Sequence, residues 1–393
     1  MINKGLLIIL VSLLFTSTLV AQEAQNIADL DFLYKKIQEL HSYKDQLKGN
    51  KSYKKLYEGL RKNLKSSDEF EIYQSLLRMI YPIRDNHLGL WRKPDSSLRF
   101  KYLKLEIDTT QIESRYNCYP KDSIEGIYAR ADGARYILHR ERENVYYLQN
   151  FRTGIVEIIL NDAGNKSFDA INFMSPPVPY VLYRNVRLVN GKLGNMNFQK
   201  FQPDKYAPIK FGKEKFEYRE LKSKVGYLRL SSFSTSSDNH TMAKSFFDII
   251  KAKLIPECLI VDLRNNLGGG YRTSKQFLTF LKKYRGQIYL LQNNNTMSNA
   301  EQFILDLKGK SGLLTLGEAT RGTITYGSNY GKAMILPSKR FIFYPTDMRG
   351  RSRDLAYENI GIKPNILLDP FGDDWITQTI KHIEDKINTI YIK

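Results

Sequence analysis

The chain has 393 residues, of which 42% are hydrophobic and 12% aromatic, so it can bury real cores and is predicted to be globular with two or three lobes. Its two cysteines, Cys118 and Cys258, exclude a disulfide framework and a structural zinc site, and we interpret both as small core residues. The net charge of +19 is spread along the chain rather than gathered in one block, which argues against a nucleic-acid partner. A solvated basic surface, or one that faces an anionic cell envelope, fits this pattern better.

The first residues have the pattern of a secretory signal. Lys4 provides a positive charge, residues 6–20 are an apolar run, and small or polar residues follow at 21–23. This predicts a cleaved signal peptide over residues 1–21 and an exported protein, periplasmic or extracellular. An uncleaved anchor is the alternative. No cysteine follows the apolar run, which disfavours a lipoprotein anchor.

Residues 22–96 are predicted to form a helical lobe. Apolar residues recur at helical spacing in three stretches, 30–40, 56–64 and 70–80, and the polar residues 66–68 give the third a capping signal. The lobe is expected to end at Tyr81 and Pro82 and to open into a turn over residues 84–87 that carries His87.

The pattern then changes twice. Residues 97–222 contain short runs rich in Tyr, Ile and Val between turn signals, such as 126–130 and 156–160, and are predicted to form a β-rich domain whose ligand the sequence does not indicate. From residue 223 to 393 strands alternate with helices, which predicts a mixed α/β fold. The expected strands cover 225–230, 258–263, 287–291 and 313–316, and the expected helices cover 241–254, 274–284 and 299–308.

Ser298 lies where one of these strands gives way to a helix. A serine at a helix N-terminus is close to free amides and to the positive end of the helix dipole, which stabilise negative charge on a nearby oxygen. Ser298 and Glu301 also have the spacing of a capping box, and that structural reading is the simpler alternative.

A second segment, Asp-Leu-Arg-Asn-Asn-Leu-Gly-Gly-Gly at 262–270, also follows a predicted buried strand. Consecutive glycines let the backbone approach a ligand closely and direct amides at it, as an oxyanion hole requires. The pattern does not fit a phosphate-binding P-loop or a dinucleotide fingerprint, because no Gly-Lys-Ser or Gly-Lys-Thr follows and the glycines are contiguous. A plain tight turn remains the alternative.

Four segments occur in a fixed order: Val-Gly-Tyr-Leu-Arg-Leu at 225–230, Leu-Ile-Val-Asp-Leu-Arg-Asn-Asn before the glycines, Thr-x-Ser-x-x-Glu at 296–301, and Gly-Glu-x-Thr-x-Gly at 317–322. This set resembles the serine peptidase family that includes C-terminal processing proteases, tail-specific proteases and the tricorn core. The resemblance covers about residues 225–370, and Asp-x-His at 85–87 is similar to the amino-terminal region of the tricorn-like branch. It implies an α/β peptidase core with a crotonase-like spiral and Ser298 as nucleophile.

The two branches of that family activate the serine differently. The processing-protease branch resembles Gly-Glu-x-Thr-x-Gly-Lys, with the lysine as base, but Thr323 stands at the lysine position here. Arg321 cannot replace it, because a guanidinium stays protonated. A serine needs an adjacent base near neutral pH, so the base must come from elsewhere.

The tricorn-like branch uses a histidine and a glutamate. By this resemblance His87 is the general base and acid, which its ordinary pKa suits, and Glu358 is the acid that orients it. That branch has a serine before the histidine as a relay, whereas this chain has Asn86, whose amide can donate and accept. His87 as a structural loop residue and Glu358 as a surface acid are the alternatives.

The resemblance further implies an oxyanion hole from the backbone amides of Gly268 and Asn299. No motif indicates a metal or an organic cofactor. The expected substrate is a polypeptide of the cell envelope or the extracellular space, cleaved through an acyl-enzyme, and the oligomeric state is not indicated. Two other functions stay open: a ligand-binding protein on the same fold, and a descendant that has lost catalysis.

Overall fold

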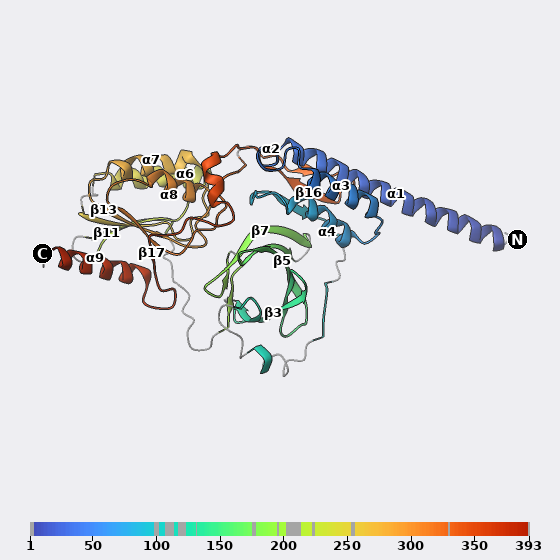
Figure 1. The fold of residues 1–393 in the computed structure, drawn as a ribbon, viewed down its shortest axis with the longest axis horizontal. Helices are drawn as coiled ribbons and strands as arrows, with labels where there is room; N and C mark the ends of the chain where they lie inside the picture. Colours follow the sequence, from blue (N-terminus) through green and yellow to red (C-terminus); the bar gives the residue numbers. More distant parts are fainter. Residues whose placement is uncertain are drawn as a thin grey trace.

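The computed structural model describes residues 4–97, 102–106, 114–116, 123–130, 132–174, 178–194, 196–201, 214–221, 225–252, 256–328 and 331–391. Cys118 lies outside the described residues, and Cys258 is half-buried. Three lobes meet at the centre: a helical lobe, a β-barrel and an α/β lobe (Figure 1). Their junction brings together segments that are far apart in the sequence.

The helical lobe contains α1 (Lys4–Glu39), α2 (His41–Gln46), α3 (Lys51–Asn63) and α4 (Glu69–Ile80). The predicted apolar stripes are confirmed, since their residues form one buried cluster: Leu30, Leu33, Ile37, Leu60, Ile72, Leu76, Leu77 and Ile80. The predicted cap is also confirmed, because the Asp68 carboxylate accepts the Glu71 N–H at 2.9 Å. In the part of the chain that the structure describes, no helix has both the length and the apolar character needed to cross a bilayer.

The middle segment folds into an eight-stranded antiparallel barrel. Its strands are β2 (Gly126–Arg130), β3 (Arg135–Arg142), β4 (Val145–Asn150), β5 (Val156–Gly164), β6 (Ser167–Phe173), β7 (Tyr180–Val189), β8 (Lys192–Leu193) and β9 (Phe198–Lys200). Neighbours pair in the order β7-β6-β5-β4-β3-β2-β9-β8, and a further pairing of β7 with β8 closes the ring. Figure 1 shows this ring in green, and the closure leaves no free edge within it.

Side chains fill the barrel. One buried cluster takes residues from all eight strands, which only the interior permits: Tyr128, Tyr136, Leu138, Tyr146, Leu148, Ile158, Leu160, Phe168, Ala170, Val186, Leu188, Leu193 and Phe198. Residues of alternate parity, including Ile159 and Ile171, belong instead to the cluster of the helical lobe. The barrel therefore packs its outer wall against the helices, and its interior is a core rather than a ligand cavity.

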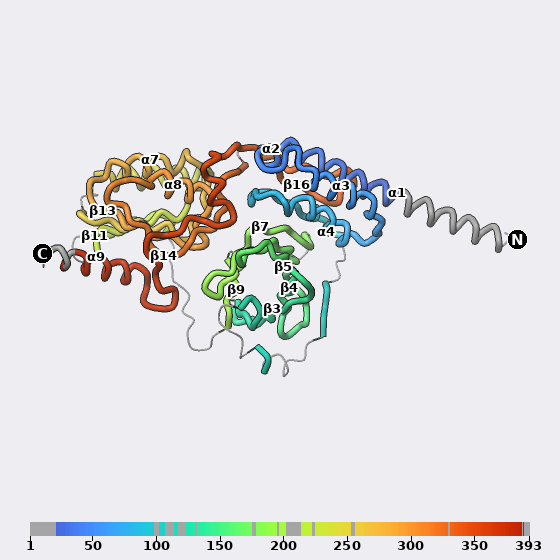
Figure 2. The backbone as a smooth tube through the Cα atoms, in the orientation of Figure 1, coloured from blue at the N-terminus to red at the C-terminus, as the bar shows by residue number. Residues whose placement is uncertain are grey.

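The helical lobe is completed by a hairpin from the other end of the chain. Strand β1 (Gly89–Arg92) pairs antiparallel with β16 (Phe341–Tyr344), which pairs with β15 (Met334–Ile335). On its other side β1 touches the barrel through the pair Trp91 and Val181. In Figure 2 the orange tube of the carboxyl half accordingly runs among the blue segments. The domain boundaries at 22, 97 and 223 stay a prediction.

The α/β lobe has a six-stranded sheet in the order β10-β11-β12-β13-β14-β17. All neighbours are parallel except the edge strand β10 (Phe216–Glu220). The other strands are β11 (Val225–Leu230), β12 (Cys258–Asp262), β13 (Gln287–Gln292), β14 (Leu313–Gly317) and β17 (Ile366–Leu367), and the helices are α6 (Ser237–Ile250), α7 (Tyr271–Lys283), α8 (Asn299–Leu307) and α9 (Trp375–Tyr391). The first three helices cover one face and α9 the other. The predicted mixed α/β class is confirmed, with two helices starting three or four residues earlier than expected.

Candidate active site

Ser298 stands at the carboxyl end of β13, one residue before α8. Its backbone has φ 56° and ψ −125°, a conformation that costs a non-glycine residue free energy. Its N–H is held twice, by the Thr323 carbonyl at 2.8 Å and by the Glu301 carboxylate at 3.0 Å. The carboxylate half of the predicted capping box is thus present, and the strained turn fixes the serine at the start of the helix.

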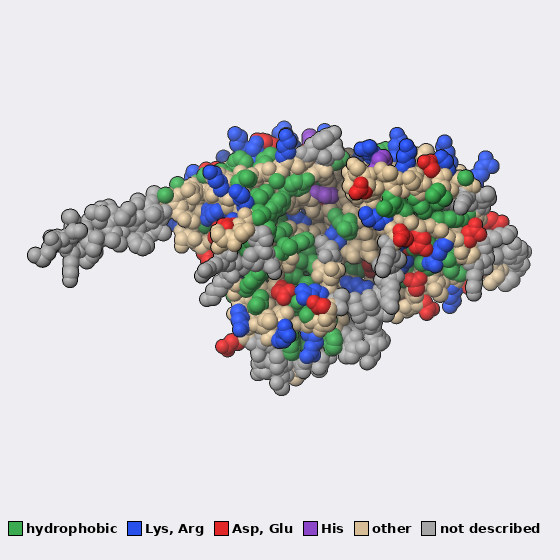
Figure 3. All heavy atoms as spheres, turned by 180° about the vertical axis from the view of Figure 1, so that it is seen from behind, with side chains coloured by type: hydrophobic (Ala, Val, Ile, Leu, Met, Phe, Trp, Pro, Cys, Tyr) green, Lys and Arg blue, Asp and Glu red, His purple; other side chains and the backbone are tan. Residues whose placement is uncertain are grey.

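His87 reaches the same point from the helical lobe. The turn after α4 carries it across the junction, where its Nε2 lies 3.2 Å from Ser298 Oγ. Both residues are half-buried. The spatial prediction that an imidazole from the amino-terminal lobe meets the Ser298 hydroxyl is confirmed. The space-filling view from behind shows the molecule hollowed where the lobes meet, with hydrophobic side chains gathered on the helical-lobe side (Figure 3).

Two opposing effects act on the imidazole. Burial lowers the pKa of His87, and the charge of Asp85 raises it, with burial the larger. Asp85 is fully buried. Its carboxylate accepts hydrogen bonds from the backbone N–H of His87 at 3.3 Å and from the Thr346 hydroxyl at 2.6 Å. The second ring nitrogen, Nδ1, is buried and has no partner among the described residues. The ring therefore favours its neutral form, which can accept a proton.

Glu358 lies behind the histidine turn and does not touch the ring. It is fully buried and accepts the N–H groups of Ile324 at 3.0 Å and Thr325 at 2.9 Å. Burial raises its pKa to about 7 against these hydrogen bonds, and the charges of Asp85 and Glu301 push in the same direction as burial. The predicted proximity of Glu358 to the histidine turn is present, but the link to the imidazole has to pass through Asn86.

Asn86 makes half of that link. Its amide Nδ2 donates to Glu358 Oε1 at 2.9 Å and also lies 2.9 Å from the Gly322 carbonyl and 2.6 Å from Asn359 Oδ1. Its backbone N–H is 3.3 Å from the same Glu358 oxygen. No hydrogen bond joins the Asn86 side chain to His87 within the described residues, so the predicted relay is formed on the acid side and open on the imidazole side.

The segment from Thr320 to Thr325 is pinned between two buried carboxylates. Glu301 accepts the Thr320 hydroxyl and the N–H groups of Gly322 at 2.7 Å and Thr323 at 3.0 Å, besides that of Ser298. Glu358 takes the next two N–H groups of the same segment. Glu301 is therefore more than a helix cap: it ties the Ser298 backbone to the segment that meets the histidine turn.

The two predicted oxyanion amides differ. The Asn299 N–H, at the first position of α8, has no acceptor among the described residues and lies beside Ser298. Gly268 also lies against the serine, because a Cβ added to it would be 2.8 Å from Ser298 Cβ and 2.9 Å from Asn299 N. However, its N–H already donates to the buried Asn266 Oδ1 at 2.8 Å. The oxyanion role of the Gly268 amide stays a prediction, and it requires that the Asn266 side chain release that amide.

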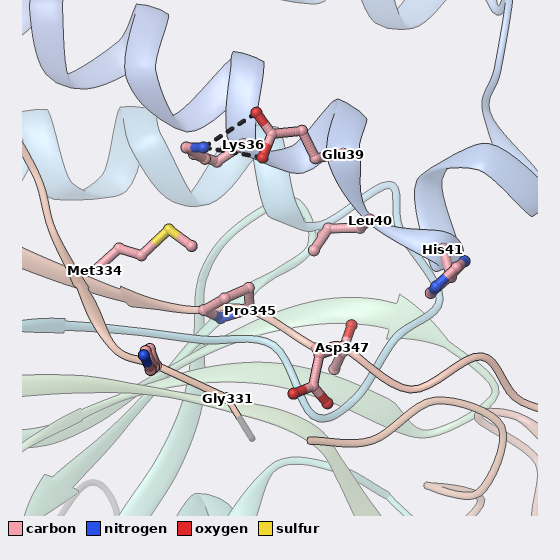
Figure 4. A pocket seen from close by; sticks show the side chains of 10 residues that line it. Lys36, Glu39, Leu40, His41, Gly331, Met334, Pro345 and Asp347 are labelled. Carbon is pink, nitrogen blue, oxygen red and sulfur yellow. Dashed lines mark hydrogen bonds and ion pairs between the residues drawn. The ribbon is translucent and has the colours of Figure 1, made fainter. Parts of the chain in front are cut away.

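Among the described residues, no lysine is hydrogen-bonded to Ser298 in place of the histidine. Thr323, at the lysine position of the processing branch, is buried and contributes its carbonyl to Ser298. Burial lowers the pKa of Arg321 to about 10, so the guanidinium stays charged at neutral pH, as expected. Lys332 is exposed and lines a surface cavity of about 330 Å³ together with Leu40, Met334 and other residues of the helical lobe (Figure 4). No hydrogen bond of the described residues joins Lys332 to Ser298.

Two contributors to the site were not assigned a role from the sequence, namely Asp85 beside the imidazole and Asn266 on the glycine amide, and Glu301 was interpreted only as part of a capping box. Asp85 and Glu301 stood inside the motifs Asp-x-His and Ser-x-x-Glu, and Asn266 directly precedes the exposed Leu267 before the glycines. Their motif positions were a signal, but only the fold gives the direction of each side chain. Within the described parts of the chain, no group of three or more His, Cys, Asp or Glu residues is arranged to hold a metal ion.

No family model and no curated protein matches the chain in sequence. Among solved structures it is similar to the photosystem II D1 C-terminal processing protease, at 12% identity over 88% of this chain and 94% of that one, with a TM-score of 0.40. A putative peptidase from Parabacteroides merdae is 14% identical over 90% of this chain and 92% of its own, with a TM-score of 0.45. The tricorn protease is 11% identical over 93% of this chain and 37% of its own, with a TM-score of 0.46. The chain is similar in structure to C-terminal processing and tricorn-type peptidases.

Proposed function

We propose that this protein is a serine endopeptidase in which Ser298 is the nucleophile, His87 the general base and acid, and Glu358 the acid that orients the histidine turn through Asn86. The observation that supports the proposal most strongly is the 3.2 Å contact between His87 Nε2 and Ser298 Oγ, made between residues from different lobes. It is the geometry that a serine hydroxyl and its base require.

The reaction follows from this geometry. His87 Nε2 takes the Ser298 proton while Oγ attacks the peptide carbonyl carbon, and the Asn299 N–H faces the developing oxyanion together with Gly268 once Asn266 releases that amide. The protonated imidazole then gives its proton to the leaving amine, which leaves an ester on Ser298. Water, activated by the same imidazole, hydrolyses the ester. The chemistry of the residues requires no metal or cofactor.

The substrate and location are part of the same proposal. The signal-like segment at residues 1–21 supports export to the periplasm or the extracellular space, and the charge of +19 supports association with an anionic envelope surface. We infer a crotonase-like spiral for the α/β lobe, in line with its parallel sheet covered by helices. The expected substrates are polypeptides of that compartment. A ligand-binding function gains little support from the barrel, whose interior is filled.

A fluorophosphonate probe tests the assignment directly. The wild-type protein should be labelled covalently at one residue, and mass spectrometry of the labelled peptide should identify Ser298, because its hydroxyl is hydrogen-bonded to His87. Heat-unfolded protein, in which the lobes have separated, serves as the control and should not react. A folded wild-type protein without any label would remove the peptidase assignment and leave a binding protein.

The pH dependence should report the environment of His87. Because burial lowers its pKa, the imidazole stays neutral to a lower pH than a free histidine, and kcat/KM should hold until the pH falls below ~6.5. Peptide hydrolysis measured from pH 4 to 9 would check this. The variant Glu358→Gln shows which of the two buried groups causes the fall of kcat/KM at low pH. If His87 causes it, the midpoint of that fall is the same in the variant and the wild type. If the wild type has a midpoint near pH 7 that the variant lacks, the fall is due to Glu358 instead.

A further inference from the structure

A β-bulge in the barrel lies at the junction of the three lobes. On β6 and β7 the pairing passes from Ala170 opposite Tyr183 to Phe168 opposite Val186, so Arg184 and Asn185 together face Asp169. Asn185 has φ 50°, the left-handed conformation that such an extra residue adopts. The strand also changes faces here, since Leu182 belongs to the helical-lobe cluster and Val186 to the barrel interior. Two neighbouring polar side chains are thereby directed out of the barrel.

Arg184 holds the segment that leads to His87. Its guanidinium donates to the Ile80 carbonyl at 3.3 Å and the Ile83 carbonyl at 3.0 Å, which are the end of α4 and the start of the histidine turn. Asp169 fixes the guanidinium at 2.6 Å, and both side chains are buried. A guanidinium has the fork of donors that two carbonyls and a carboxylate can share. The backbone N–H of Asp85 also donates to the Ile83 carbonyl.

Asn185 holds the segment on the serine side. Its Nδ2 donates to the Arg321 carbonyl at 2.7 Å and lies 3.2 Å from the Gly322 carbonyl, while its Oδ1 accepts the Ser167 hydroxyl at 2.7 Å. Arg187, further along β7, donates to the Thr320 and Ile360 carbonyls, each at 2.7 Å. The next residue of the held segment is Thr323, whose carbonyl binds the Ser298 N–H.

Other polar contacts also join the barrel to its neighbours, such as Asn161 Nδ2 to the Tyr81 hydroxyl at 3.2 Å and Asn190 Nδ2 to Glu318 at 2.7 Å. A cavity of about 430 Å³ lies at the junction, and its lining includes Arg84, Asn86, Asn161, Arg184, Asn185 and Asn359. The barrel and the helical lobe share an apolar cluster, but among the described residues no apolar cluster joins the barrel to the α/β lobe. Directional hydrogen bonds therefore set the alignment of the barrel with the segment that anchors Ser298. The Gly322 carbonyl receives both Asn86, from the histidine turn, and Asn185, from the barrel, so the three lobes meet at this one oxygen.

We propose that the Arg184–Asn185 bulge of the barrel is a positioning device that sets His87 against Ser298, which makes the barrel part of the catalytic assembly rather than a separate binding module. Arg184 fixes the approach of the histidine turn, and Asn185 fixes the Thr320–Thr323 segment that anchors the serine. Neither side chain touches the reacting atoms, so both are positioning residues. This inference rests on the proposed peptidase function.

Asn185→Gly is the decisive variant, because glycine keeps the left-handed backbone and removes only the amide. Asn165→Gly is the matched control: Asn165 has φ 54° in an exposed hairpin turn of the same barrel. The concentration of active enzyme is determined by titration with the fluorophosphonate probe, so that misfolded molecules do not lower the calculated kcat. Asn185→Gly should lower kcat at least about tenfold and leave KM within about twofold, since the misalignment affects the reaction step and not substrate binding. Asn165→Gly should match wild type.

Hydrogen exchange of peptides covering residues 319–326 gives a readout independent of turnover. It should be faster in Asn185→Gly and unchanged in Asn165→Gly, because the Arg321 and Gly322 carbonyls lose their barrel donor. Wild-type kcat and exchange in Asn185→Gly would overturn the inference while the peptidase assignment stands. An equal fall of kcat in Asn185→Gly and Asn165→Gly would mean that the loss comes from a less stable barrel, and it would also overturn the inference. A wild-type protein that is not labelled at all removes both proposals, and this is seen before any variant is compared.

Discussion

Replacing Ser298 by alanine is expected to reduce kcat for peptide hydrolysis by about 10⁶-fold and to abolish fluorophosphonate labelling, because the nucleophile and its contact with His87 disappear together. An unstructured polypeptide with a quenched fluorophore, followed under saturating conditions, measures the loss. The free energy of unfolding should change by no more than about 1 kcal/mol, because the Ser298 hydroxyl makes no capping hydrogen bond to the helix.

A glycine at the same position separates chemistry from strain. Because Ser298 has φ 56°, glycine relieves a backbone conformation that both serine and alanine adopt at a cost. Ser298→Gly should therefore be as inactive as Ser298→Ala and more stable than it by about 1 kcal/mol. Denaturant unfolding of the two variants makes the comparison. Residual turnover above about one thousandth of wild type in both would show that another residue is the nucleophile.

His87→Ala should reduce kcat/KM by at least about 10⁴-fold, because without the imidazole no neighbouring base takes the Ser298 proton. Lys332→Ala is the matched comparison. A lysine base is the expectation for the processing-type branch, from which this sequence departs at Thr323. Lys332 is exposed beside the helical lobe and should be dispensable. Both variants are assayed with the same peptide and probe.

The opposite result is equally informative. Loss of activity in Lys332→Ala with retention in His87→Ala would mean that the segment around residue 332 closes over the serine and acts as in the lysine branch. Restoration of His87→Ala by added imidazole would support the base assignment further, since the lost ring leaves room at that face of Ser298.

Local patterns were enough to predict most elements of the fold. The apolar stripes of the helical lobe, the Asp68 cap and the alternating strands and helices after residue 225 all depend on short-range periodicity and turn chemistry. The pairing of β1 with β16 could not be predicted, because nothing local in residues 89–92 specifies a partner near residue 342. The barrel closure through β7 and β8 is non-local in the same way.

The candidate site also has features that the sequence predicted and features that it did not. Ser298, Gly268 and His87 stood in recognisable motifs, and the structure brings all three together. The bond from the Gly268 amide to Asn266 was not predictable, because it depends on a side-chain rotamer. The bulge at Asn185 is hidden for another reason: Leu182, Val186 and Leu188 are an even number of residues apart, as if they lay on one face, although the strand changes faces between Leu182 and Val186.

The late arrival of β16 has a consequence for biosynthesis. Translation delivers His87 long before Tyr344, so a nascent chain possesses the imidazole while the sheet beside it still lacks its neighbouring strand. The hydroxyl of Ser298 likewise emerges before Glu358, the anchor of the adjoining amides. The residues of the proposed catalytic site are accordingly brought together only when nearly the whole polypeptide has left the ribosome.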